Sequence, residues 1–218
     1  MPPIQVEVIV QNYFAEQAAE QEATEREAAE PDTSAGIQSP AIELATWESW
    51  FERWLEALDP KLSPIQAYEL SLRLTDDAEI QSLNAQYRQT DQPTDVLAFA
   101  ALEVESALPA AAQLEMPLYL GDIVISVETA QVQAAQHGHE LRQELAWLAA
   151  HALLHLLGWD HPDKASLLEM LQQQQALLET IGETVGETIG CSSSYYQDDY
   201  QDEKQNDKTD GASLSIHS

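Results

Sequence analysis

The chain has 218 residues, 44% of them hydrophobic, which suits one domain with appendages or two small domains. It carries 38 acidic and nine basic residues, a net charge of −29, and residues 47–181 alone hold 21 acidic and six basic residues, or −15. This charge excludes a protein that binds polyanions through bulk positive charge. Cys191 is the single cysteine, so the sequence has no disulfide framework, and a metal site would use histidine nitrogen.

Neither of the two segments considered for membrane targeting fits that role. Residues 1–10 lack the basic and apolar regions of a secretory signal. The apolar run at residues 145–157 is too short to span a bilayer. We therefore expect a soluble, cytoplasmic protein that makes no membrane contact.

The first third of the chain predicts a strand, an insertion and a helix. Alternating apolar residues at 4–10 indicate a half-buried strand. Residues 16–40 are rich in Ala, Glu and Gln and then in Pro, Ser and Gly, without an apolar stripe, so we expect a mobile acidic insertion. Residues 47–58 place aromatic and leucine side chains at helical spacing, and we expect these aromatics in the core rather than on a base-stacking surface.

The remaining patterns predict an α+β fold. Residues 68–74 alternate and predict a strand, followed by a helix at 77–87 that Asp76 or Thr75 caps, with Glu79 in the capping-box position. Further segments are strands at 96–100 and 119–126, a loop at 103–116, and helices at 127–136, from about 140, and at 165–181. Together they predict a small, mostly four-stranded sheet with packed helices and a central histidine-bearing helix.

The domain organisation follows from composition. Residues 1–181 are expected to form a single metal-hydrolase domain that includes the insertion. Residues 182–218 are rich in Ser, Gln, Asp and Tyr with few core formers, so we expect a disordered acidic tail.

Residues 144–163 contain three histidines, His151, His155 and His161, spaced H-x3-H-x5-H. The first two lie one helical turn apart and share a face. Gly158 falls where the helix should end, which lets the chain turn back and bring His161 to the other two. Three imidazoles with an open fourth position are typical of catalytic zinc, so the spacing predicts one Zn²⁺ ion, held by three histidines and a water, at the C-terminal end of this helix.

Burial supports this interpretation. Every residue from 145 to 157 other than His151 and His155 is apolar, and an unsatisfied imidazole there would cost about 1–3 kcal/mol. The alternative is that the histidines bond to backbone carbonyls or to each other. His137 and His139 flank Gly138 in a predicted turn between helices, and we do not expect them in the zinc site.

Zinc held by neutral imidazoles can lower the pKa of bound water from about 16 to about 7, which suits hydrolysis of a carbonyl or a phosphoryl centre. The spacing matches metzincin proteases, which place a Glu directly after the first histidine as the general base. Here that residue is Ala152, which cannot move a proton. Ordinary peptide hydrolysis is therefore disfavoured.

Three blocks of the chain resemble the YbeY family of bacterial metal-dependent endoribonucleases, which act in rRNA maturation. The blocks are residues 83–88 with 91–99 (LNAQYR, DQPTDVLAF), residues 120–126 (LGDIVIS) and residues 151–161 (HALLHLLGWDH). The resemblance covers most of residues 47–181. The family usually has Gly where this chain has Ala152, whose extra methyl group can narrow the space beside the metal. It usually has Tyr where this chain has Trp159, which lacks the phenol, so we assign no catalytic proton transfer to this position.

The resemblance implies residue roles and partners. It makes His151, His155 and His161 the zinc ligands and Arg88 an arginine that matters for RNA cleavage, unless Arg88 merely pairs with Asp91 or Asp95. Asp122 and Ser126 are expected to orient ligands or shape the pocket floor, with hydrogen bonding at the strand end as the alternative.

The implied substrate is single-stranded RNA, chiefly rRNA precursors including the 3′ end of 16S rRNA. Ribosome quality control and ribosomal-protein partners follow from the same resemblance, and DNA is not an expected partner. Two other hypotheses stay open: a metallopeptidase-like hydrolase with a base such as Asp122, and a zinc-stabilised ribosome-assembly adaptor without catalysis.

Overall fold

The structure is a computed structural model that describes residues 3–14, 42–103 and 115–183. The insertion predicted at residues 16–40, most of the loop predicted at 103–116, and the tail from residue 184 lie outside the described residues.

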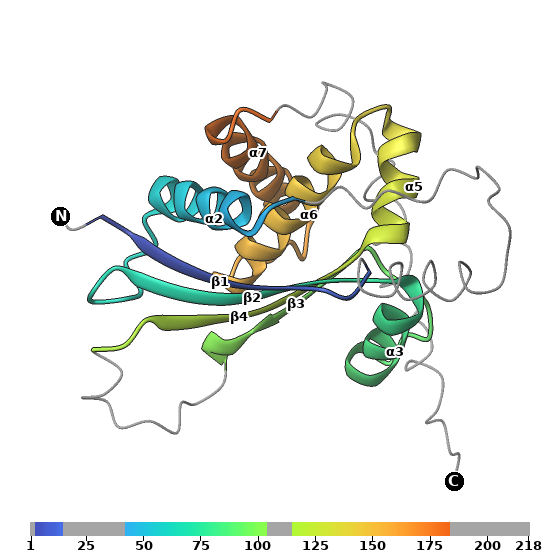
Figure 1. The fold of residues 1–218 in the computed structure, drawn as a ribbon, viewed down its shortest axis with the longest axis horizontal. Helices are drawn as coiled ribbons and strands as arrows, with labels where there is room; N and C mark the ends of the chain where they lie inside the picture. Colours follow the sequence, from blue (N-terminus) through green and yellow to red (C-terminus); the bar gives the residue numbers. More distant parts are fainter. Residues whose placement is uncertain (1–2, 15–41, 104–114, 184–218) are drawn as a thin grey trace, which may run out of the picture. The chain divides into compact units, whose positions relative to one another are not determined.

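Four strands form one sheet in the order β1-β2-β4-β3 (Figure 1). β1 (Gln5–Asn12), β2 (Ala67–Thr75) and β4 (Leu118–Ser126) run parallel, and β3 (Val96–Ala100) pairs antiparallel with β4 at one edge. The predicted alternation places Leu70, Leu72 and Leu74 of β2 in the core. The predicted α+β fold with a four-stranded sheet is confirmed.

Helices cover both faces of this sheet. α2 (Leu44–Leu58), α6 (Leu141–Leu156) and α7 (Lys164–Thr180) lie on one face, and α3 (Asp77–Arg88) lies on the other (Figure 1). β3 continues into a single 3-10 turn, η1 (Ala101–Glu103), and β4 continues directly into α5 (Val127–His137). Since α6 packs against α5, α7, β3 and β4, the histidine-bearing helix is central, as predicted. None of the helices in the described ranges is both long and apolar enough to cross a membrane.

The aromatic side chains of α2 are core, as the helical spacing predicted. Trp47, Phe51 and Trp54 are fully buried, and the Phe51 and Trp54 rings meet edge to face with centroids 5.1 Å apart. The indole N–H of Trp54 donates to the carbonyl of Leu177 at 3.0 Å, which ties α2 to α7.

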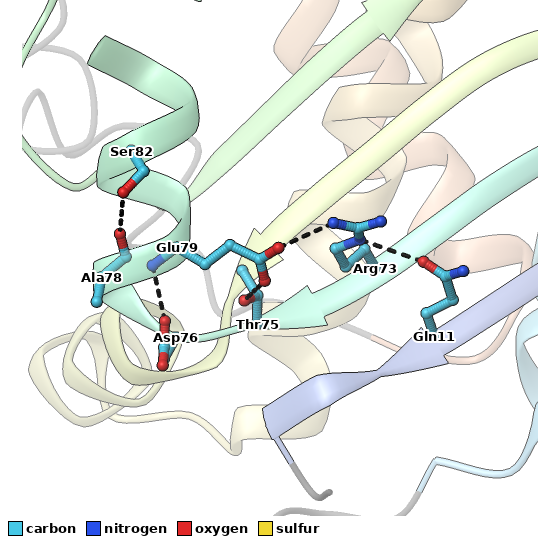
Figure 2. A network of polar contacts seen from close by, with 7 residues as sticks. All are labelled: Gln11, Arg73, Thr75, Asp76, Ala78, Glu79 and Ser82. Atoms are coloured by element: carbon cyan, nitrogen blue, oxygen red, sulfur yellow. Dashed lines mark hydrogen bonds and ion pairs between the residues drawn. The ribbon is translucent and has the colours of Figure 1, made fainter. Parts of the chain in front are cut away.

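The start of α3 shows how the sequence fixes the junction with β2. The Asp76 carboxylate accepts a hydrogen bond from the backbone N–H of Glu79 at 2.8 Å, which confirms Asp76 as the cap. The Glu79 side chain does not complete a capping box in the described contacts: it accepts from Arg73 at 2.8 Å and from the Thr75 hydroxyl (Figure 2). Glu79 therefore joins α3 to the end of β2 instead of closing the cap.

A bulge in β4 brings the edge of the sheet close to α6. Leu70 of β2 pairs with Gly121 while Glu69 pairs with Tyr119, so Leu120 is an extra residue in β4. Gly121 has φ +137°, and a Cβ there would lie 2.1 Å from the carbonyl oxygen of Phe99 and 3.1 Å from Leu156 Cδ2. Only glycine fits this crossing of β3, β4 and the end of α6.

Candidate metal centre

α6 carries two of the three histidines in an otherwise buried helix. From Leu145 to Leu156 every residue except His151 and His155 is buried, because the helix packs against other elements on most sides. Gly158 takes the left-handed conformation at φ +86°, and the backbone N–H of Trp159 donates to the Leu154 carbonyl at 3.0 Å. The chain then turns, and the Asp160 carboxylate accepts from the backbone N–H of His161 at 2.8 Å.

This turn brings the three histidines together, as their spacing predicted. One ring nitrogen from each of His151, His155 and His161 lies within 4.8 Å of the others. The ring centroids are 4.7 Å apart for His151 and His155, 5.7 Å for His151 and His161, and 5.2 Å for His155 and His161. The three residues form a group that could hold a metal ion.

Hydrogen bonds fix the protonation of the two helical imidazoles. The Gln174 amide donates its N–H to the Trp147 carbonyl at 2.9 Å, so its oxygen faces His151 Nδ1 at 3.3 Å and accepts from it. The Trp159 carbonyl lies 2.9 Å from His155 Nδ1 and can only accept. Both Nδ1 atoms therefore carry the proton, and both Nε2 atoms present lone pairs.

Those two Nε2 atoms point at each other across 3.1 Å. With Nδ1 protonated in both rings, two acceptor lone pairs meet at this distance, which repels unless a cation lies near both. A ring that donates its other N–H to a carbonyl or amide oxygen is the usual arrangement of a metal-bound histidine. The donor set and its hydrogen bonds therefore fit a transition-metal ion.

The pKa values agree with neutral imidazoles. Burial, with the neighbouring His155 and His161, lowers the pKa of His151 to about 3. Burial, followed by the charge of His161, lowers the pKa of His155. Neutral imidazole is the form that binds a metal.

Arg88 is the last residue of α3. Its positive charge contributes to lowering the pKa of both His151 and His155, so it acts electrostatically on the histidine cluster. The predicted alternative partners bond elsewhere in the described structure: Asp91 accepts from Gln81 at 2.9 Å. Asp95 likewise accepts from Gln133 at 2.9 Å. Within the described residues, no hydrogen bond or ion pair holds the Arg88 side chain, which is exposed.

Asp122 and Ser126 make local contacts. The exposed Asp122 carboxylate accepts from the Tyr119 hydroxyl at 2.8 Å. Ser126 is the N-cap of α5, where its hydroxyl accepts from the backbone N–H of Thr129 at 3.1 Å and donates to Asp77. None of these described hydrogen bonds reaches a cluster histidine.

His137 and His139 lie with Glu144 in a second group, separate from the three-histidine cluster. His139 bonds to the fully buried carboxylate of Glu144, and the rings of His137 and His139 stack with centroids 5.8 Å apart. Burial lowers the pKa of both histidines. The contact between His139 and Glu144 links the α5–α6 turn to the core.

Gln174 contacts the cluster but was not among the site residues predicted from the sequence. It is fully buried, whereas Gln172 in the same run of four glutamines is exposed. The signal was available: Gln174 interrupts the apolar stripe of α7 formed by Leu167, Met170, Leu171, Leu177 and Leu178. A polar residue at a core position of a helix next to a histidine cluster needs a polar partner.

The two departures from the family pattern fall in different environments. Ala152 is fully buried, so its methyl packs within the core. Trp159 is 37% exposed, and its backbone carbonyl, not its side chain, holds His155.

Comparisons with known proteins agree with the three sequence blocks. The family described as Endoribonuclease YbeY matches residues 34–182. The chain is 57% identical over 180 residues to Endoribonuclease YbeY of Nostoc sp. (strain PCC 7120), an alignment that covers 82% of this chain and 91% of that protein. It is 61% identical over 150 residues to Endoribonuclease YbeY of Cyanothece sp. (strain PCC 7425), covering 69% of this chain and 88% of that protein. The chain therefore belongs to the YbeY endoribonuclease family.

Proposed function

We propose that this protein is a zinc-dependent endoribonuclease that cleaves single-stranded RNA in rRNA maturation, including the 3′ end of 16S rRNA. The proposal places it in the cytoplasm, with the ribosome or ribosomal proteins as partners and a part in ribosome quality control. The observation that carries it is the convergence of three histidine side chains in a chain of this family.

His151, His155 and His161 would hold the zinc ion. When bound, zinc supplies a Lewis acid for a phosphoryl oxygen and lowers the pKa of water. Gln174 and the Trp159 carbonyl accept from the Nδ1–H groups of His151 and His155, which leaves both Nε2 lone pairs available to a metal ion.

Arg88 would act on the phosphodiester itself. A guanidinium donates two parallel hydrogen bonds to phosphate oxygens and stays charged at every working pH. Its exposed position leaves the side chain open to substrate, and its charge reaches His151 and His155. In this role it neutralises the charge that develops on the oxygens as the bond breaks.

Cleavage of a single-stranded RNA by zinc-loaded protein tests this function, with His151→Ala, Arg88→Ala and Arg88→Lys beside the wild type. We expect His151→Ala to lose zinc and activity, and Arg88→Ala to lower kcat about 10²–10³-fold, as removal of one preorganised donor does. Arg88→Lys keeps the charge without the paired donors and should recover part of the loss. Equal cleavage by all four proteins would identify a contaminating nuclease and refute the proposal.

The nucleophile is either water or the RNA 2′-hydroxyl. The 3′ ends of the products separate them, because a 2′,3′-cyclic phosphate excludes direct attack by water. The metallopeptidase alternative needs a base, and the Asp122 carboxylate proposed for it binds the Tyr119 hydroxyl instead. The adaptor alternative gains from the acidic charge: zinc-loaded protein that binds ribosomal proteins but never cleaves RNA would favour it.

A further inference from the structure

The proposed substrate is a polyanion, yet the chain has little positive charge to offer it. Four of the six basic residues between 47 and 181 are engaged in the protein: Arg73 pairs with Glu79, Arg142 with Glu183 and Lys61 with Asp59, and Arg53 donates to the Thr180 carbonyl. Contacts to phosphates therefore cannot supply most of the affinity for RNA. Another kind of contact has to hold the strand.

Tyr87 offers an aromatic surface directly beside Arg88. It is 59% exposed at the end of α3, an unusual position for a large aromatic ring. The ring packs edge to face on Phe99 of the edge strand β3, with centroids 5.0 Å apart. Because this contact orients the ring in advance, little side-chain freedom is lost when a ligand stacks on it.

Trp159 offers a second aromatic surface within the metal-binding segment. It lies in the turn between His155 and His161 and is 37% exposed. Its carbonyl accepts the hydrogen bond from His155 Nδ1, so its backbone position is tied to the histidine cluster. Two exposed aromatic rings thus lie on the two segments that carry Arg88 and the histidines.

We infer that Tyr87 and Trp159 form a binding site for unpaired RNA bases, each stacking on a base near the phosphate that Arg88 contacts. This inference rests on the proposed function and names how the substrate is held. Stacking is available to every base but requires that the base be unpaired, so it favours single strands over duplexes. Stacking also predicts that the affinity for RNA depends only weakly on salt concentration, because few phosphates are neutralised and few counterions are released.

Binding can be measured apart from cleavage. The probe is a short single-stranded 2′-O-methyl RNA with one 2-aminopurine, whose fluorescence falls on stacking, titrated into zinc-loaded protein, with gels to check that it stays intact. We expect Tyr87→Leu and Trp159→Leu each to weaken binding about tenfold and reduce the quenching. Tyr87→Phe and Trp159→Phe keep an aromatic ring and should bind as the wild type does.

Tyr13→Leu is the matched control, since Tyr13 is also an exposed aromatic, 36% exposed, but follows β1 at the opposite edge of the sheet. It should leave binding unchanged. The logarithm of the association constant should fall with the logarithm of salt concentration at a slope of about −0.7, because Arg88 neutralises one phosphate and about 0.7 counterions are released per phosphate neutralised on a single strand.

Unchanged affinity in both leucine variants, no binding of the probe by the wild type, or a slope steeper than about −3 would overturn the inference. Cleavage assays keep it distinct from the proposed function. If the wild type cleaves RNA and both leucine variants keep its KM, the stacking site fails and the nuclease stands. If binding depends on both rings but no RNA is cleaved, the nuclease fails and the stacking site stands.

Discussion

Replacement of Gln174 tests whether the histidine cluster is preorganised for a metal. Gln174 is fully buried, holds Trp147 through its amide N–H at 2.9 Å, and presents its oxygen to His151 Nδ1 at 3.3 Å. Gln174→Met keeps the length of the side chain but removes the acceptor. The Nδ1–H of the partly buried His151 then loses its partner, and an unpaired polar group of this kind costs about 1–3 kcal/mol.

Two quantities should change. The free energy of unfolding of the metal-free protein should fall by about 1–3 kcal/mol. Zinc affinity should fall about 10–100-fold, because the His151 ring is no longer held in the orientation and tautomer that direct Nε2 to the metal. A tenfold loss corresponds to about 1.4 kcal/mol, so the two effects are of similar size.

Zinc affinity is measured by competition with a chromophoric chelator, and stability by urea unfolding in EDTA. Gln172→Met is the matched control, because Gln172 lies on the same helix, two residues away, and is exposed. It should change neither quantity. If Gln174→Met bound zinc as tightly as Gln172→Met, the hydrogen bond to His151 would not orient a ligand, and the reasoning from tautomers would be refuted.

Two further changes probe the fold and the electrostatics. Gly121→Ala should destabilise the protein by more than about 2 kcal/mol in urea unfolding, since the new Cβ meets the Phe99 carbonyl and φ +137° strains any L-residue; a loss below about 0.5 kcal/mol would contradict the close approach. Metal-free protein should lose stability as pH falls below about 6.5. In that range His151 takes up a proton in the unfolded chain but stays neutral in the folded protein, where its pKa is about 3. The loss from this group is about 2 kcal/mol at pH 5, so a His151→Gln variant should show a shallower decline between pH 6.5 and 5, and equal slopes would argue against the shift.

Most of the fold could be predicted because its elements carry strong periodic patterns. The strand at residues 68–74 and the helix at 47–58 are found within a few residues of their predicted bounds, since each has one face that must be buried. Helix ends were predictable where a side chain caps locally, as Asp76 does. The bond from Glu79 to Arg73 was not, because it joins a helix to a strand and depends on how the two pack.

The bulge at Leu120 had no clear signal in the sequence. From the sequence alone, Gly121 could be an ordinary strand glycine. Glycine is required there because the Phe99 carbonyl of β3 and the Leu156 side chain of α6 leave no space for a Cβ. Contacts of this kind follow from tertiary packing and not from local pattern.

In the candidate site, too, local spacing predicted some residues, while others follow only from tertiary packing. His151 and His155 were predictable as a pair because four residues in a helix bring them to one face, and Gly158 predicted the return of His161. The partners of their Nδ1 atoms come from α7 and from the turn after α6. Gln174 reaches His151 only because α7 presents one particular face to α6, and the turn geometry alone aims the Trp159 carbonyl at His155.

These partners explain how a helix buried on most sides can carry two imidazoles. The Nδ1–H of each ring donates to one acceptor, and the Nε2 of each ring faces the Nε2 of the other ring. The two Nε2 lone pairs that form no hydrogen bond to another element among the described residues therefore converge on one point. If the histidines only formed hydrogen bonds with each other, an N–H of one ring would donate to a nitrogen of the next. Here the two unprotonated Nε2 atoms of His151 and His155 face each other instead. The convergence of unprotonated nitrogens at the end of α6, more than the number of histidines, is what indicates a metal.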